Sequence, residues 1–319
     1  MQDPTLILIG ASAGGVNALT RLTSALPAGL PATVLIVMHI GARRSELPEI
    51  LQKRCPLPVM HAQDCAPLLP GEVLIAPPDR HLTVERHQGM ARARLWHGPK
   101  ENHTRPAIDP LFRSAAVAFD GKVFAAILTG YLDDGTAGLY AVKACGGHAI
   151  VQDPNDAQVP DMPASALRHV AVDQVLPLSE IGPVLAALAQ HAPASVHQKP
   201  GLPEWMAVEN RYVQGAAGME DLQRIGVPSG YTCPECSGAL WKIKDAIPPR
   251  FRCHTGHSFT ARVLAHLQDD TVETALWSAL RALQEKLCME QEMLGDATGP
   301  DHVQTLQAEI ATLHALLSR

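Results

Sequence analysis

The chain has 319 residues, of which 46% are hydrophobic and only 4% aromatic, so a sizeable aliphatic core is expected and a disordered chain is excluded. Its 26 Lys and Arg against 32 Asp and Glu give a net charge of −6, which argues against a general nucleic-acid-binding role. The sequence shows no signal peptide and no apolar stretch of about 18 residues that would span a membrane. We therefore expect a cytoplasmic protein of about two domains.

The first 191 residues alternate short apolar runs with amphipathic stretches. The expected strands are Leu6–Ile9, Thr33–Met38, Val73–Ala76, Val123–Leu128 and Ala149–Val151. The expected helices are Gly15–Ala25, Arg44–Lys53, Pro110–Phe119 and Gly135–Cys145. A stricter alternation from Leu82 to Trp96 predicts a hairpin at an edge of the sheet. This order predicts an α/β domain over residues 1–191, with a doubly wound, mostly parallel, Rossmann-like sheet.

Three further segments follow this domain. Residues 192–229 are rich in Pro, Gly, Ala and Gln, which predicts a linker with one short helix at Met219–Ile225. Residues 230–267 are expected to form a small cysteine-bearing module. Residues 268–319 carry apolar residues at helical spacing, which predicts a hairpin of two amphipathic helices with a break at Gly295–Pro300.

The first expected strand leads into a glycine-rich turn, Gly10–Gly15, with the sequence GASAGG. A dinucleotide site needs G-x-G-x-x-G and an acidic residue after the second strand, but Ser12 takes the middle position and His39 ends the second strand. A nucleotide-binding protein is therefore disfavoured. The pattern G-x-S-x-G is instead typical of a nucleophilic serine on a turn from strand to helix.

A serine nucleophile needs a histidine base and a group that orients this base. His39 follows the second strand and Asp134 follows a later one, and carboxyl ends of parallel strands share one crevice. Each residue alone has an ordinary explanation, since Ser12 and Asp134 could be helix caps and His39 is one of 15 histidines. Asp133 is an alternative to Asp134 for the catalytic role. Their joint placement at strand ends favours a Ser–His–Asp triad. The chain order Ser, His, Asp disfavours an α/β-hydrolase.

Leu6–His191 resembles the catalytic domain of the chemotaxis protein-glutamate methylesterases, the CheB family. Five segments carry the resemblance, in family order: Ile9–Gly15, Val37–Ile40, Arg105–Ala116, Leu128–Gly138 and Val151–Leu167. The resemblance implies that Ser12 is the nucleophile, His39 the general base and Asp134, rather than Asp133, the orienting carboxylate. It implies a hydrolase that demethylates glutamate γ-methyl esters, and deamidates glutamine, on a methylated chemoreceptor or similar signalling protein. Catalysis would need no cofactor.

The expected substrate and oxyanion residues are Ala13, Gly130 and Tyr131, with the turn at Gly130–Tyr131 supplying a backbone donor. Ala13 stands where the family often has Thr, and Tyr131 begins a segment that usually reads Met-Gly. Family members in chemotaxis commonly carry an N-terminal receiver domain. Because the first strand begins near residue 5, we expect none here, which leaves control by a separate regulator or by the C-terminal parts of the chain open. The alternative function is a non-catalytic signalling scaffold of the same fold.

The cysteine-bearing module contains Cys233-x2-Cys236 and Cys253-x3-His257, with His254 as an alternative fourth ligand. Two such pairs are typical of a closed, structural Zn²⁺ site in a zinc-ribbon module, and similar extensions occur behind some methylesterase domains. The odd total of seven cysteines disfavours a disulfide framework. The module is locally basic at Lys242, Lys244, Arg250 and Arg252. Without a recognition helix, nucleic-acid binding stays a weak alternative.

Overall fold

The computed structural model describes residues 4–119, 122–191, 203–294 and 300–318. The chain divides into two compact units, Met1–Val263 and Leu264–Arg319. The first unit contains both the expected domain 1–191 and most of the expected cysteine-bearing module. These two parts were expected as separate domains, whereas they share one compact unit.

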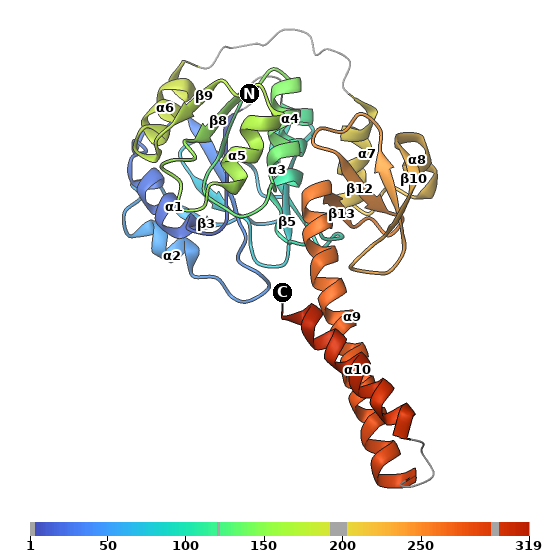
Figure 1. The fold of residues 1–319 in the computed structure, drawn as a ribbon. Helices are drawn as coiled ribbons and strands as arrows, with labels where there is room; N and C mark the ends of the chain where they lie inside the picture. The colour runs from blue at the N-terminus through green and yellow to red at the C-terminus, as the bar shows by residue number, and fades with distance from the viewer. Residues whose placement is uncertain (1–3, 120–121, 192–202, 295–299, 319) are drawn as a thin grey trace. The chain divides into compact units, whose positions relative to one another are not determined.

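A seven-stranded parallel sheet forms the centre of the first unit (Figure 1). Its strands, in sheet order, are β3 (Val59–His61), β4 (Val73–Ile75), β2 (Ala32–Met38), β1 (Thr5–Ala11), β7 (Val123–Ile127), β8 (His148–Gln152) and β9 (Gln174–Leu176). All residues of β1 and β2 are buried, as expected for strands covered on both faces. The predicted doubly wound sheet is confirmed. Strand order reverses at β1, so the carboxyl ends of β1 and β7 border a crevice of the kind where such folds bind ligands.

Helices cover both faces of this sheet. One face is covered by α1 (Gly15–Ser24), α2 (Leu47–Gln52) and α6 (Leu178–Gln190), whose apolar residues share one buried cluster. The opposite face is covered by α3 (Ile108–Ala118), α4 (Thr136–Ala144) and α5 (Asp161–His169). The expected hairpin forms as β5 (His81–His87) and β6 (Met90–Trp96). It is a separate two-stranded sheet rather than an edge of the main one. Its residues Leu82 and Val84 pack beside α3, in the buried cluster on the face that α3, α4 and α5 cover.

The described part of the expected linker is folded. It contains α7 (Glu204–Val213), the predicted short helix α8 (Met219–Ile225) and most of β10 (Gly226–Thr232). The linker prediction was wrong for α7, since Trp205, Met206 and Tyr212 are buried in the same core as α3. The rest of the expected linker, residues 192–202, lies outside the described residues.

A four-stranded antiparallel sheet follows, made of β10, β11 (Ala239–Ile243), β12 (Arg250–Cys253) and β13 (Ser258–Thr260). We call residues 226–260 the ribbon module. Figure 1 shows β12 and β13 beside α7 and α3. Buried ion pairs join the ribbon module to the α/β domain: Arg250 of β12 pairs with Asp109 of α3, and Arg252 of β12 pairs with Glu101 of the loop before α3.

The last elements are α9 (Ala261–Met289), a π-helical turn (Glu290–Leu294) and α10 (Pro300–Leu317). Both expected helices form, and most of the expected break at Gly295–Pro300 lies outside the described residues. Helix α9 begins before the expected residue 268 because Thr260 caps it: its hydroxyl accepts the N–H of Val263 at 3.2 Å. Among the described residues, no helix combines the length and apolar character needed to cross a membrane.

Candidate active site and metal cluster

The turn after β1 presents Ser12 at the carboxyl edge of the sheet. Gly14 has φ +77°, in the left-handed region that favours glycine, and a Cβ there would lie 2.7 Å from Gln158 Oε1. A Cβ at Gly10 would lie 2.6 Å from Ile108 Cγ2. The N-cap of α1 is Gly14, and no side chain caps this helix. Ser12 is therefore not a helix cap, and its hydroxyl is available for another partner.

The structure brings Ser12, His39 and Asp134 into one hydrogen-bonded chain. Ser12 Oγ lies 3.0 Å from His39 Nδ1, and His39 Nε2 lies 2.8 Å from Asp134 Oδ2. Because an ionised carboxylate only accepts hydrogen bonds, Nε2 carries the ring proton and donates it to Asp134. Nδ1 is then unprotonated and accepts the hydroxyl proton of Ser12. This is the arrangement that a general base needs.

Asp134 is buried and held by several donors. Its Oδ2 also accepts the N–H of Ile108 at 2.6 Å, and its Oδ1 accepts Asn102 Nδ2 at 2.8 Å. Burial alone would raise the pKa of Asp134, but the hydrogen bonds from His39, Ile108 and Asn102 outweigh it and hold this pKa below its ordinary value. Asp134 is therefore ionised at neutral pH. Helix α4 has Gly135 as its N-cap and no capping side chain, so Asp134 is not a cap either.

Asp133 has a different environment from Asp134. Its Oδ1 accepts the hydroxyl of Thr260 at 2.7 Å, and its hydrogen bonds do not include His39. Burial raises the pKa of Asp133 to about 6. The geometry therefore assigns the histidine contact to Asp134, in agreement with the sequence-based preference.

The expected oxyanion residues differ in what they offer. The N–H of Gly130 donates to the Val159 carbonyl at 3.0 Å, so it is not free for an oxyanion. Gly130 matters sterically instead, because a Cβ there would clash with Met162 Sδ and lie 2.8 Å from Ser12 Cβ. Within the described parts of the chain, the N–H groups of Ala13 and Tyr131 have no protein acceptor. The side chain of Tyr131 is 63% exposed beside the site.

A family model described as CheB methylesterase matches residues 7–185. The chain belongs to the CheB methylesterase family. Its relatives include a putative protein-glutamate methylesterase/protein-glutamine glutaminase of Leptospira interrogans, 38% identical over 186 residues that cover 58% of this chain and 95% of that protein. The corresponding enzyme of Azospirillum brasilense is 38% identical over 191 residues, which are 59% of this chain and 48% of the relative.

A solved structure agrees with this assignment. The CheB methylesterase catalytic domain of Thermotoga maritima is 34% identical, with a TM-score of 0.57, over 58% of this chain and 99% of that one. The family match ends at residue 185, before α7 and the ribbon module. The candidate triad therefore lies inside the CheB domain, and the ribbon module is an addition to it.

The ribbon module gathers Cys233, Cys236, Cys253 and His257, whose ligand atoms all lie within 4.8 Å of one another. Cys236 Sγ lies 3.7 Å from Cys253 Sγ, and His257 Nδ1 lies 3.6 Å from Cys253 Sγ. Ligand atoms about 2.0–2.3 Å from a tetrahedral Zn²⁺ are about 3.5–3.8 Å apart, so the donor set fits this ion. His254 is not part of this cluster. Among the described residues, Cys233, Cys236 and Cys253 form no disulfide, so their thiols are available to a metal.

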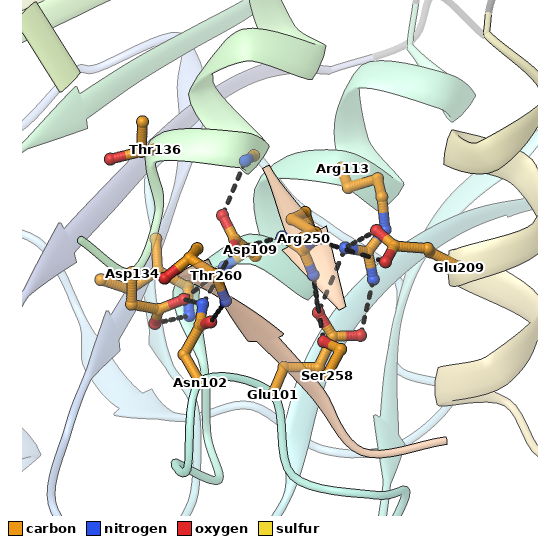
Figure 2. Close-up of polar contacts among 12 residues, drawn as sticks. Glu101, Asn102, Asp109, Arg113, Asp134, Thr136, Glu209, Arg250, Ser258 and Thr260 are labelled. Carbon is orange, nitrogen blue, oxygen red and sulfur yellow. Dashed lines mark hydrogen bonds and ion pairs between the residues drawn. The ribbon is translucent and has the colours of Figure 1, made fainter. Parts of the chain in front are cut away.

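No local sequence pattern predicts the buried network of arginines and carboxylates where the CheB domain, α7 and the ribbon module meet (Figure 2). Its members are Glu101, Asp109, Arg113, Glu209, Arg250 and Arg252. Their side chains are at most 1% exposed. Arg250 and Arg252 were expected as part of a basic surface, but both are buried and paired. This removes two of the four residues behind the nucleic-acid alternative.

Proposed function

We propose that this chain is a serine hydrolase that demethylates glutamate γ-methyl esters on a chemoreceptor-type signalling protein. The observation that supports this most strongly is the hydrogen-bonded chain Ser12–His39–Asp134 at the carboxyl edge of a CheB-family sheet. Its relatives carry the name protein-glutamate methylesterase/protein-glutamine glutaminase. The thiol-rich cluster of the ribbon module fits a reducing compartment, so we place the activity in the cytoplasm.

In the first half of the proposed reaction, Ser12 Oγ attacks the ester carbonyl while His39 Nδ1 takes its proton. The imidazolium that forms is stabilised by the ionised Asp134 on its other nitrogen. The tetrahedral oxyanion needs backbone donors, each of which typically contributes about 3 kcal/mol. The free N–H groups of Ala13 and Tyr131 are the candidates. His39 then returns the proton to the departing methoxide, which leaves as methanol. A γ-glutamyl ester remains on Ser12.

In the second half, His39 takes a proton from water, whose oxygen attacks the acyl carbonyl. Collapse of the tetrahedral intermediate returns this proton to Ser12 Oγ and releases the glutamate side chain as a carboxylic acid, which loses its remaining proton to solvent. The same steps on a glutamine side chain release ammonia, which accounts for a glutaminase activity at one site. Both halves use only water and groups of this chain, so the proposed chemistry requires no cofactor.

Methanol release from methylated receptor membranes tests this proposal in the full-length protein. We expect Ser12→Ala to lower the rate by about 10⁴-fold or more, because the nucleophile is lost. Ser24→Ala, which removes an exposed hydroxyl at the end of α1, is the matched control and should behave like the wild type. Undiminished release by Ser12→Ala would contradict the nucleophile assignment. No release by the wild type would favour the scaffold alternative.

We also propose that Cys233, Cys236, Cys253 and His257 hold a structural Zn²⁺. All four tetrahedral positions would come from the protein, which leaves no open position for substrate. Thr255 Oγ1 lies 2.9 Å from Cys253 Sγ and would donate a hydrogen bond to this thiolate. The ion would join β12 and β13 to the loop that precedes β11.

Metal analysis tests this second proposal. The purified protein should contain about one zinc per chain. Cys236→Ser should lose the metal and lower the melting temperature, whereas Cys65→Ser, an exposed cysteine outside the cluster, should do neither. Wild-type protein free of zinc after anaerobic purification, or Cys236→Ser with full zinc, would contradict the site.

A further inference from the structure

The last strand of the ribbon module binds the loop that precedes α3. The N–H of Asn102 donates to the Ser258 carbonyl at 2.8 Å, and the N–H of Ser258 donates to the Lys100 carbonyl at 3.2 Å. Asn102 has φ +51°, in the left-handed region that Asn tolerates better than most residues. The loop thus extends the ribbon sheet beyond β13, and this pairing fixes Asn102 in an uncommon conformation.

The side chain of Asn102 lies between the ribbon module and the candidate triad. Its Nδ2 donates to Asp134 Oδ1 at 2.8 Å and to Asp109 Oδ2 at 3.0 Å, and its Oδ1 accepts the N–H of Thr260 at 3.0 Å. Figure 2 shows Asn102 between Thr260 and Asp134. A flipped amide would point its oxygen at two carboxylates and its NH₂ at a donor. The partners therefore dictate one orientation, and Thr260 is the partner from the ribbon.

The ribbon module makes a second contact with the turn that carries Asp134. The hydroxyl of Thr260 donates to Asp133 Oδ1 at 2.7 Å. Just beyond the ribbon, Arg262 Nη1 donates to the Leu132 carbonyl at 3.2 Å. One strand end thus contacts both the donor to Asp134 and the residues directly before Asp134.

A third contact holds Asp109, the other carboxylate that accepts a hydrogen bond from Asn102. Arg250 Nη1 of β12 lies 2.7 Å from Asp109 Oδ2, and Asp109 Oδ1 accepts the N–H of Gly138 at 2.6 Å. Arg250 is fully buried, so water does not compete for this ion pair. Asp109 is therefore held between α3, α4 and the ribbon, and Asn102 cannot turn away from it without losing a buried hydrogen bond.

We propose that the ribbon module completes the active site, with Asn102 and Thr260 as positioning residues that hold the carboxylate of Asp134 against His39. This inference rests on the proposed function, because it assigns a role in the same triad. Without the donor from Asn102, Asp134 Oδ1 loses its closest hydrogen bond, and the carboxylate is free to rotate away from His39 Nε2. His39 would then no longer be held in the tautomer that accepts the proton of Ser12. The activity of the CheB domain would thus depend on a module outside the family match.

The first test measures steady-state methanol release and the rate at which a fluorophosphonate probe labels Ser12. For Asn102→Ala we expect kcat and the labelling rate to fall together by about 10- to 100-fold, the range for a lost hydrogen bond to a charged group, with KM unchanged. A weakened hydrogen bond should also shift the downfield NMR signal of the His39–Asp134 proton. Wild-type kcat and labelling in Asn102→Ala would overturn the proposal.

Thr260 offers a milder test with a rescue and a matched control. Thr260→Val removes the hydroxyl and should lower both rates about 3- to 10-fold, while Thr260→Ser, which keeps it, should restore them. Ser229→Ala removes a half-buried hydroxyl of the same ribbon module, which donates to the Leu240 carbonyl, and should leave both rates near wild type. Equal losses in Thr260→Val and Ser229→Ala, or no rescue by Ser, would overturn the role of Thr260.

Asn102→Asp supplies a pH signature that a purely structural role would not produce. Protonated, the new carboxyl donates to Asp134 as the amide does; ionised, it has no proton to donate and repels Asp134. The charged and titratable groups around it are His39, Glu101, Asp109, Asp133, Asp134 and Arg250. The ratio of variant to wild-type kcat should therefore fall as pH rises. A ratio that does not change with pH would overturn the proposal.

Labelling separates this inference from the proposed function, because the probe reports on Ser12 without a glutamyl ester. A wild type that labels but releases no methanol, together with slow labelling of Asn102→Ala, contradicts the methylesterase function and supports the positioning role. A wild type that releases methanol, with an equally active Asn102→Ala, supports the function and overturns the positioning role.

Discussion

The candidate triad and the buried network at the ribbon module both contain buried carboxylates, but different groups surround the negative charge in each. Asp134 is surrounded by His39 and by uncharged N–H donors from Ile108 and Asn102. Glu101 instead contacts three guanidinium groups, those of Arg113, Arg250 and Arg252. Burial would raise the pKa of Glu101, but these arginines hold it well below its ordinary value.

The difference shows how one fold uses a buried carboxylate for two purposes. Within the described parts of the chain, the negative charge of Asp134 has no arginine or lysine beside it, so it is compensated only when His39 takes a proton during the proposed reaction. The charge of Glu101 is always compensated by its three arginine partners. Glu101 therefore contributes to the attachment of the ribbon module and is not available as a base. Asp109, whose pKa burial raises to about 7, lies between these two regions and contacts both Asn102 and Arg250.

The largest expected effect comes from removing the charge at the triad. Asp134→Asn should lower kcat by about 10⁴-fold, because the amide no longer selects the productive tautomer of His39. Asp133→Asn changes the adjacent, equally buried carboxylate and should retain most of the activity. Methanol release by both variants measures the contrast. Similar losses in the two variants would contradict the assignment of Asp134.

A smaller effect, on stability rather than on rate, is expected in the network. Glu101→Gln leaves three buried guanidinium groups short of an ionised partner, and we expect it to lower the free energy of unfolding by about 3–5 kcal/mol. Glu235→Gln is the control, because its partners Lys100 and His103 are more exposed and such pairs contribute about 1 kcal/mol or less. Urea denaturation at pH 7 measures both. A loss of less than 1 kcal/mol in Glu101→Gln would show that the network does not attach the ribbon module.

The smallest effect concerns Asp133 and pH. Burial raises its pKa in the folded protein to about 6, whereas an unfolded chain has about 3.9. A raised carboxyl pKa contributes stability below pH 4 that is lost as pH rises through 6. Asn does not ionise, so Asp133→Asn should become more stable than the wild type by about 1–3 kcal/mol at pH 8, relative to pH 4. A stability difference that is equal at both pH values would contradict the raised pKa.

Much of the sheet could be predicted because its strands are long and uniformly apolar. β1 and β2 are continuous runs of seven buried residues, and the glycine-rich turn after β1 marks the strand end. β3 and β9 have only three residues each and show no usable periodicity. Helix α7 was missed because its buried face includes Glu209, a charged residue whose burial depends on Arg113 and Arg252 from other elements.

The candidate site likewise contains residues that the sequence could predict and residues that it could not. Ser12, His39 and Asp134 could be proposed together because each follows a strand, and parallel topology brings strand ends to one edge. Asn102 and Thr260 follow no comparable rule. They lie 158 positions apart in the sequence and meet only because the ribbon module packs on the CheB domain. Their partners are set by tertiary contacts, which no local pattern encodes.

A covalent intermediate on Ser12 can be detected directly in a single-turnover reaction of the full-length protein with a methylated receptor fragment, quenched in acid and mapped by mass spectrometry. We predict one equivalent of methanol before glutamate appears, and a γ-glutamyl ester on Ser12. A covalent group on another residue, or methanol release by Ser12→Ala at the wild-type rate, would contradict the account.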